Sequence, residues 1–208
     1  MVTPRGVPGK VAPPRWPSPA CGRENFDAIK FLQQLSTAVH TALPGALLIA
    51  ENASGFPGTT ESPTRAGLGF DMKWDTRWMR DSLRFMTRQH AERARHVGEM
   101  RYSFTAAAHE RVVLPLSHET VVDGRQSLLT RMPGDAAQKL ANIRAYLSFM
   151  WAHPGKKLLF MGTELGQTSA WSEQHGLDWW LLEQPGHAQL HHFMSVLNRT
   201  YRARSELW

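Results

Sequence analysis

Short apolar runs that end in polar clusters constrain the fold of this chain more than any other feature. Arg111–Leu116 leads directly into Ser117-His-Glu119, and Ala46–Ala50 leads into Glu51. A third run spans Lys157–Met161. Runs of this kind are typical of strands buried in a parallel sheet, whose carboxyl ends carry side chains to a rim where chemistry takes place. The pattern predicts an enzyme surface built on a parallel sheet.

Segments with helical spacing separate these runs. A weaker strand is expected at Gly69–Lys73. The apolar spacing predicts helices over residues 24–43, through Trp78, Leu83 and Met86, around residues 104–108, and over residues 135–153 and 186–204. Strands that alternate with helices predict an α/β protein built of parallel crossovers.

The charge of the chain is unevenly distributed. The formal net charge is +6, from 24 Lys and Arg against 18 Asp and Glu. Residues 1–21 carry Arg5, Lys10 and Arg15 without an acid, together with six of the thirteen prolines. Proline excludes a helix and a central strand there, so we expect a mobile tail, with an organelle transit peptide as the weaker alternative. The tryptophans lie in apolar segments and do not alternate with basic residues, which argues against nucleic-acid binding.

The sequence gives no signal for a cofactor, a metal or a membrane. Cys21 is the only cysteine, so a disulfide within the chain is excluded and a reducing compartment is expected. His187, His191 and His192 have helical spacing but no acidic or cysteine partner, which predicts an exposed histidine face instead of a zinc site. No apolar run approaches membrane-spanning length. These observations predict a soluble, cytoplasmic protein.

Several longer motifs occur in a characteristic order. They are Ile49-Ala-Glu-Asn52, Met132-Pro-Gly-Asp135, Trp151-Ala-His-Pro-Gly-Lys-Lys157 and Leu177-Asp-Trp179. In this order they resemble the catalytic barrel of glycogen branching enzymes, members of the α-amylase superfamily. The resemblance implies a partial (β/α)8 TIM-type barrel over residues 22–208, covering roughly the last four strand–helix units, with residues 1–21 as the separate tail.

Glu51 is the strongest candidate for catalysis. A carboxyl that follows a buried strand is partly desolvated, holds its proton more tightly and can act as an acid, whereas the alternative is a glutamate that caps the next loop. The resemblance favours the interpretation of Glu51 as an acid, because it places Glu51 at the position of the general acid/base. It also implies that His118 binds the sugar and that Glu119 stands where the family has the aspartate that stabilises the transition state. Thr120 stands where the family usually has glutamate.

The family's nucleophile has no counterpart in this chain. Retaining glycoside chemistry needs two carboxyls about 5–5.5 Å apart. In the family the second one is an aspartate in an Arg-x-Asp-Ala strand, and here the proline-rich segment takes that place. Asp71 and Asp75 match no catalytic position, and Asp75 is expected near a helix start.

Aromatic residues after the strands are candidates for glucan binding, since flat rings stack on sugar faces. The residues proposed for substrate binding are Trp74, Glu164, Trp171 and Trp179. Most tryptophans in an enzyme are packing residues, and we expect the same of the majority of these.

The resemblance implies a piece of a 1,4-α-glucan branching enzyme, which would transfer an α-1,4-linked glucan segment to a 6-hydroxyl and form an α-1,6 branch. The expected substrate is an α-glucan such as glycogen or amylose, and a second chain could supply the first half of the barrel. A fragment of a hydrolase from the same superfamily is the enzymatic alternative. The alternative from another class is a glucan-binding module without catalysis.

Overall fold

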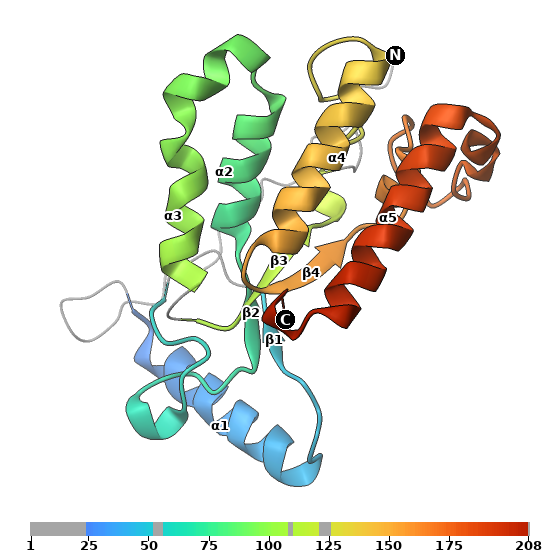
Figure 1. Cartoon of the computed structure of the whole chain (residues 1–208). Coiled ribbons are helices and arrows are strands. Elements are labelled where there is room, and N and C mark those ends of the chain that lie inside the picture. The colour runs from blue at the N-terminus through green and yellow to red at the C-terminus, as the bar shows by residue number, and fades with distance from the viewer. Residues whose placement is uncertain (1–23, 52–55, 108–109, 121–125, 208) are drawn as a thin grey trace, which may run out of the picture.

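Four parallel strands form the sheet of this protein. The computed structural model describes residues 24–51, 56–107, 110–120 and 126–207. The strands are β1 (Ile49–Ala50), β2 (Met72–Trp74), β3 (Val112–Leu116) and β4 (Lys156–Leu159), and they lie side by side in chain order (Figure 1). Each pair is parallel. Parallel neighbours that follow one another along the chain need crossover connections, which is the predicted α/β arrangement.

The predicted helices are confirmed, but the one expected around residues 104–108 begins six residues earlier, at Gly98. They are α1 (Phe26–Ala42), α2 (Thr76–Thr87), α3 (Gly98–Ala107), α4 (Ala136–Ala152) and α5 (Pro185–Ala203). Short 3-10 turns lie at Pro63–Arg65, His90–His96, His118–Thr120, Thr163–Leu165, Trp179–Glu183 and Ser205–Leu207. The strand expected at Gly69–Lys73 begins three residues later, at Met72. The tail predicted at residues 1–21 lies outside the described residues.

The motif Met132-Pro-Gly-Asp135 starts the long helix α4. The Asp135 side chain accepts a hydrogen bond from the Gln138 backbone N–H at 2.8 Å, and the Gln138 side chain accepts one from the Asp135 backbone N–H at 2.9 Å. This reciprocal capping box satisfies two amides that the helix leaves unpaired. Gly134 has a φ of +98°, and a Cβ there would meet the Gln138 side chain. The motif therefore has a structural role.

The motif Trp151–Lys157 connects α4 to β4. The Lys157 Nζ donates hydrogen bonds to the carbonyls of His153 and Gly155, at 2.5 and 2.7 Å. Burial lowers the pKa of Lys157 to about 8, and burial also lowers the pKa of His153. These hydrogen bonds fix the tight turn between α4 and β4, and the lowered pKa values follow from the burial of the Lys157 and His153 side chains.

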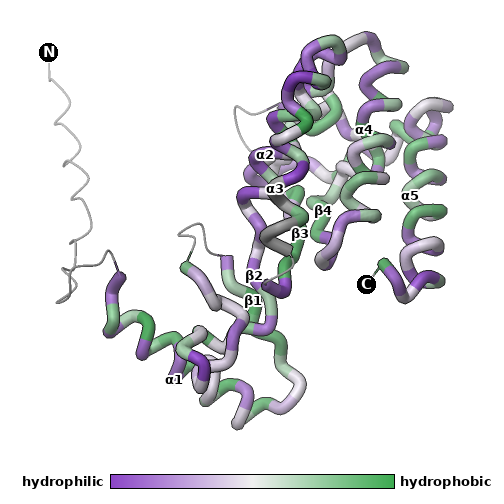
Figure 2. The backbone as a smooth tube through the Cα atoms, turned by 60° about the vertical axis from the view of Figure 1, so that its left-hand side comes forward, coloured by the Kyte–Doolittle hydropathy of each residue, from purple (hydrophilic) through white to green (hydrophobic). Residues whose placement is uncertain are grey.

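The hydrophobic core lies between β3 and the helices α2, α4 and α5. Leu114, Leu116 and Tyr146 are fully buried. The Tyr146 and Ser82 hydroxyls hydrogen-bond at 2.7 Å and join α4 to α2. The hydropathy colouring in Figure 2 shows β3 as a hydrophobic strand beside these helices. The prediction that this strand is buried is confirmed, since all five of its residues are buried.

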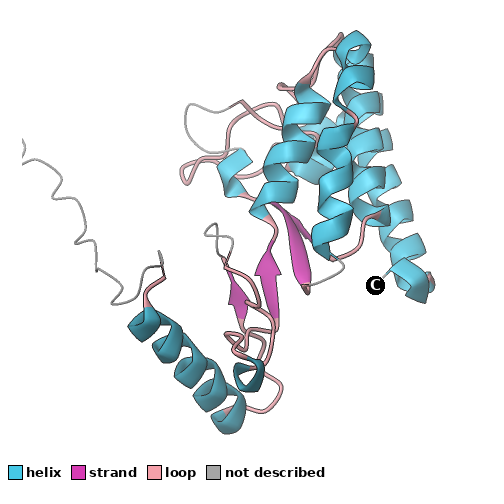
Figure 3. Cartoon of the chain, turned by 90° about the vertical axis from the view of Figure 1, so that its left-hand side faces the viewer, coloured by secondary structure: helices cyan, strands magenta, loops and turns pink. Residues whose placement is uncertain are grey.

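The same prediction is wrong for the first strand. Leu47 is 65% exposed and Ile49 is 45% exposed, although the segment is wholly apolar. β1 lies at the edge of the sheet and pairs only with β2 among the described strands. Figure 3 shows α1 diverging from the sheet instead of packing over β1. A strand without a neighbour on one side leaves its apolar side chains uncovered.

Polar contacts attach α1 to the segment before β2. The Ser36 hydroxyl donates to the Leu68 carbonyl at 2.7 Å, and the Gln33 side chain donates to the Gly67 carbonyl at 2.9 Å. His40 Nε2 lies 2.9 Å from Asp71, whose carboxylate also accepts from the Leu48 N–H. That backbone N–H, with His40, lowers the pKa of Asp71. The side of α1 that carries these residues is thus fixed to the segment before β2, while another side of the helix stays exposed.

Within the described ranges, no helix is long and apolar enough to cross a membrane.

Candidate functional site

The carboxyl ends of the four strands lie at one edge of the sheet. Glu51 follows β1, Asp75 follows β2, His118 comes soon after β3 and Phe160 follows β4. Asp75 is the N-cap of α2, since its side chain accepts from the Trp78 N–H at 2.8 Å. This confirms the expectation that Asp75 lies at a helix start. Of the four residues just named, Glu51 and His118 then remain as the polar side chains without a capping role.

Glu51 is exposed in this chain. The expectation that a buried strand partly desolvates its carboxyl is wrong here, because β1 is an edge strand. Side chains alternate between the two faces of a strand, and residues in register share a face. Ile49 is in register with Met72, so the alternation assigns Glu51 to the sheet face that carries Met72 and Trp74. The opposite face of the sheet carries Leu114 and Leu116, which pack against the helices.

Three rings from separate segments form a row at the ends of β3 and β4. The His118 and Phe160 ring centroids are 6.4 Å apart, and the Phe160 and Trp171 centroids are 5.8 Å apart at a nearly perpendicular angle of 83°. The Phe160 N–H donates to the Leu116 carbonyl at 2.8 Å, which extends the pairing of the two strands to the rim. Phe160 was not among the predicted site residues. Side chains alternate along β4, which puts Phe160 on the same sheet face as Leu158. This alternation is the sequence signal that could have identified Phe160.

The loop that carries Trp171 is tied back to the turn after β4. The Asp178 carboxylate accepts from the Ser169 hydroxyl at 2.5 Å, and the Asp178 N–H donates to the Gln167 side chain at 3.2 Å. Gln167 in turn donates its backbone N–H to the Gly162 carbonyl at 3.0 Å. These bonds hold Trp171 at the rim.

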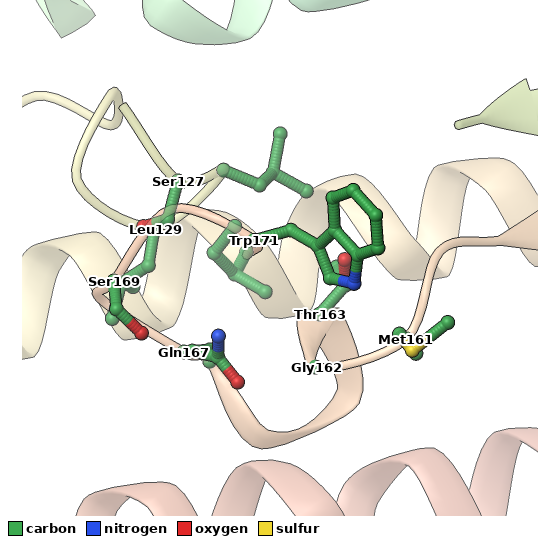
Figure 4. A pocket seen from close by; sticks show the side chains of 11 residues that line it. Ser127, Leu129, Met161, Gly162, Thr163, Gln167, Ser169 and Trp171 are labelled. Atoms are coloured by element: carbon green, nitrogen blue, oxygen red, sulfur yellow. The ribbon is translucent and has the colours of Figure 1, made fainter. Parts of the chain in front are cut away.

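A small pocket lies beside Trp171 (Figure 4). Ser127 and Leu129 line one side, and Thr163, Gln167 and Trp171 belong to the loop that lines the other. Its volume of about 10 Å³ is close to the space of one water molecule and far below that of a sugar-binding pocket. A sugar ring therefore does not fit into this pocket.

His118 and Glu119 point in different directions. Glu119 lines a depression beside α2 together with Arg80, Arg84 and Arg131. The ring of His118 instead approaches Phe160. The structure therefore places the Glu119 carboxylate among arginines beside α2.

The structure does not bring Glu51 into contact with His118. Ala50 is in register with Lys73, and Lys73 is in register with Val112. Glu51 is therefore level with Val113, and β3 continues three residues further, to Leu116, roughly 10 Å in the strand direction at about 3.3 Å per residue, before His118 begins a 3-10 turn. The two residues share one edge of the sheet, with β2 between their strands.

The remaining predicted site residues are spread around this edge. Trp74 is half-buried at the end of β2, and Trp179 is 58% exposed on the turn before α5. Glu164 lines a different groove, between β4 and α5. His187 was expected on an exposed histidine face, but it is buried and its Nδ1 lies 2.8 Å from the Leu165 carbonyl. That prediction is wrong because the turn after β4 packs against this side of α5.

Comparison with known proteins identifies relatives along most of the chain. No protein-family model matches it. The chain is 49% identical to the 1,4-alpha-glucan branching enzyme GlgB of Leifsonia xyli over 90% of its own length and 26% of the relative. For the enzymes of the same name from Pseudomonas fluorescens Pf-5 and Cupriavidus pinatubonensis, the identities are 49% and 48%, over 87% and 92% of this chain and 24% and 26% of the relatives. The chain thus spans about a quarter of the length of the curated relatives it matches.

Solved structures agree on the fold. A cyclomaltodextrinase superposes with a TM-score of 0.58 at 19% identity, covering 86% of this chain and 29% of the other. A Nostoc punctiforme debranching enzyme superposes with a TM-score of 0.56 at 14% identity, covering 85% of this chain and 38% of the other. The four-stranded parallel sheet is accordingly part of a TIM-type barrel, as the sequence predicted.

Proposed function

We propose that this chain, a relative of the 1,4-α-glucan branching enzymes over about nine-tenths of its length, contributes part of a branching-enzyme catalytic barrel. The complete enzyme would cut an α-1,4 linkage and pass the glucan segment to a 6-hydroxyl. The observation that carries the proposal is the identity of 46 to 49% to branching enzymes along nearly the whole chain. A cytoplasmic location is consistent with it, because the chain has one cysteine.

In this proposal Glu51 is the general acid/base. Its position after β1, on the sheet face that carries Trp74, supports this role. His118 would bind a glucosyl hydroxyl beside the rings of Phe160 and Trp171, and Glu119 would occupy the place of the transition-state aspartate. Trp74, Glu164 and Trp179 would contact more distant parts of the glucan.

In this proposal the second carboxyl comes from polypeptide outside residues 1–208. A covalent glycosyl intermediate needs a nucleophile about 5–5.5 Å from the acid/base. The family's Arg-x-Asp-Ala strand has no counterpart in this sequence. We therefore propose that a second chain carrying the first half of the barrel is the partner, and that the chain alone is inactive.

A glucan-binding module without catalysis is the second candidate. It is favoured by the absence of the nucleophile from the sequence and by Trp179 and Trp180, which are 58% and 55% exposed. A hydrolase fragment is less well supported, because the structural neighbours with hydrolase names are less than 20% identical to this chain.

The test is an amylose assay with and without a separately produced first half of the barrel. Iodine absorbance should fall without release of reducing sugar when both parts are present, and should stay unchanged with this chain alone. Glu51→Gln should lower the restored rate by at least about a hundredfold, since it removes the proton donor. Full activity in that variant would refute the acid/base role. Glucan binding without any restored activity would favour the binding module.

A further inference from the structure

The depression beside α2 is lined by arginines from two separate segments. Its volume is about 530 Å³, which is within the range of about 300–1,000 Å³ that is usual for small-molecule sites. Arg80 and Arg84 come from α2, and Arg131 comes from the turn before α4. Among the described residues, Glu119 is the one acid in its wall. Three guanidinium groups and one carboxylate give this wall a net charge of +2, which favours an anionic ligand.

Helical spacing places the charged and the apolar parts of the wall side by side. Arg80 and Arg84 lie one turn apart on α2, and so do Met79 and Leu83. All four line the depression, and Met79 and Leu83 are buried. Buried apolar side chains lower the dielectric constant beside the arginines, so that an anion is attracted more strongly than on an open surface.

The segments around the depression are fixed by contacts that need no ligand. The Ser82 and Tyr146 hydroxyls join α2 to α4 at 2.7 Å. The Arg131 N–H donates to the Ser127 carbonyl at 3.2 Å. Glu119 lies in the 3-10 turn that follows β3. A ligand would therefore meet elements that are already in place, which lowers the entropy cost of binding.

Nearby acids neutralise these arginines only in part. Arg84 lies 2.8 Å from Asp81 and 3.4 Å from Glu99. Arg80 is exposed and belongs to no ion pair within the part of the chain that the structure describes. Residues 77–101 hold seven arginines against three acids, a net charge of +4 in a chain whose total is +6. This helical region therefore keeps an excess of positive charge, and the Arg80 guanidinium is available to a ligand.

We propose that the depression binds a phosphate group, either as inorganic phosphate or as the phosphate monoester of a sugar. Arg80, Arg84 and Arg131 contact its oxygens, because the planar guanidinium fork matches phosphate. A phosphate monoester carries a charge of about −1.5 to −2 at pH 7 and three terminal oxygens, which matches a wall of net charge +2 with three guanidinium groups. A carboxylate has a single charge and two oxygens and matches this wall less well.

The experiment is a titration of the ¹⁵N-labelled full chain, followed by NMR at constant ionic strength so that screening stays the same. The probes are inorganic phosphate, glucose 6-phosphate and glucuronate, which carries a carboxylate at the same carbon of the sugar. We expect saturable shifts in α2 with both phosphates and at least about tenfold weaker binding of glucuronate. Tighter binding of glucose 6-phosphate than of inorganic phosphate would identify a sugar ester as the ligand, and equal binding would identify phosphate alone. Either result upholds the site.

A pair of variants on α2 tests the role of Arg80. Arg80→Gln should weaken phosphate binding by at least about tenfold, because it removes a charge-assisted hydrogen bond. The matched control is Arg77→Gln, one turn earlier, which is also exposed but lies outside the depression. It should change the affinity by no more than about twofold. Circular dichroism shows for each variant that the helices are still formed.

Glu119→Gln tests the charge balance of the wall in the opposite direction. It should tighten phosphate binding by about two- to tenfold, because it removes a negative charge close to the ligand. Surface arginines that merely repel or attract ions through the bulk field would show no such dependence on one carboxylate.

Four results would each overturn the phosphate site. They are the absence of saturable binding, equal losses in Arg80→Gln and Arg77→Gln, glucuronate binding as tight as that of glucose 6-phosphate, and weaker binding in Glu119→Gln. The phosphate site does not depend on the proposed function, because it is measured without glucan. Its failure would leave the amylose test untouched, and phosphate binding by a chain that never restores branching would uphold the site alone.

Discussion

At the scale of single residues, the rim depends on rings brought together from distant parts of the sequence. His118 follows β3, Phe160 follows β4, and Trp171 lies on the next loop. The two centroid distances of 6.4 and 5.8 Å place all three rings in one row. The adjacent pocket is too small for a sugar, so in the proposed function a glucan would stack on the outer surface of this row.

Replacement of Trp171 tests the row directly. Trp171→Ala should weaken maltoheptaose binding by about three- to tenfold, since an aromatic stacking contact is worth about 0.5–1.5 kcal/mol. Phe31→Ala is the control, because Phe31 is 61% exposed on α1 and does not belong to the row. Isothermal titration calorimetry on the full chain measures both. Equal losses in the two variants would argue against a glucan contact specific to Trp171.

At the scale of elements, one carboxylate joins the start of β3 to β2 and to the loop after β1. Glu110 accepts from the Thr60 hydroxyl at 2.7 Å and from the backbone N–H groups of Gly58, Thr59 and Thr60. The Lys73 ammonium lies 3.0 Å from it. Burial opposes ionisation of Glu110, but these donors outweigh burial and lower its pKa below the ordinary value of 4.5. The ionised form therefore holds three segments together.

Glu110→Gln should lower the free energy of unfolding by roughly 1–3 kcal/mol at neutral pH, because Lys73 loses its counter-charge. A carboxyl whose pKa is lowered on folding stabilises the protein above its unfolded pKa, and this contribution is lost as the pH falls through the folded pKa. The difference between variant and unmodified chain should therefore begin to shrink as the pH falls below 4.5, the ordinary pKa, and should be lost once the pH passes the lowered pKa of folded Glu110. Urea unfolding from pH 3 to 7 measures it. A difference that is constant across this range would exclude the ionised carboxylate as its origin.

At the scale of the whole molecule, stability is concentrated on one side. The large core joins β3 to α2, α4 and α5, whereas α1 and β1 contribute no residue to it. Phe31, Leu43 and Leu47 are more than 60% exposed. The chain therefore combines a well-packed region around β3 with a region, α1 and β1, that is held mainly by polar contacts.

Hydrogen exchange should reveal this asymmetry. Amides of β3 and α4 should exchange slowest, and those of α1 fastest among the helices, because local opening of α1 breaks few apolar contacts. Ser36→Ala removes the bond to the Leu68 carbonyl and should accelerate exchange in α1 by about three- to tenfold, leaving α4 unchanged. Thr37→Ala is the control on the exposed side of the helix. Uniform exchange across the molecule would contradict the picture.

The sequence by itself determined the alternation of strands and helices, the start of α4 at Asp135 and the role of Asp75 as a helix cap. These features depend on periodicity and on capping groups a few residues apart, which are local properties of the chain. Only the tertiary structure decided that β1 is an uncovered edge, that Glu51 is exposed and that His187 is buried. It also decided that Phe160 lies between His118 and Trp171. Burial and ring contacts depend on which distant segments lie alongside, and an apolar run reads the same whether or not its neighbouring strand is present.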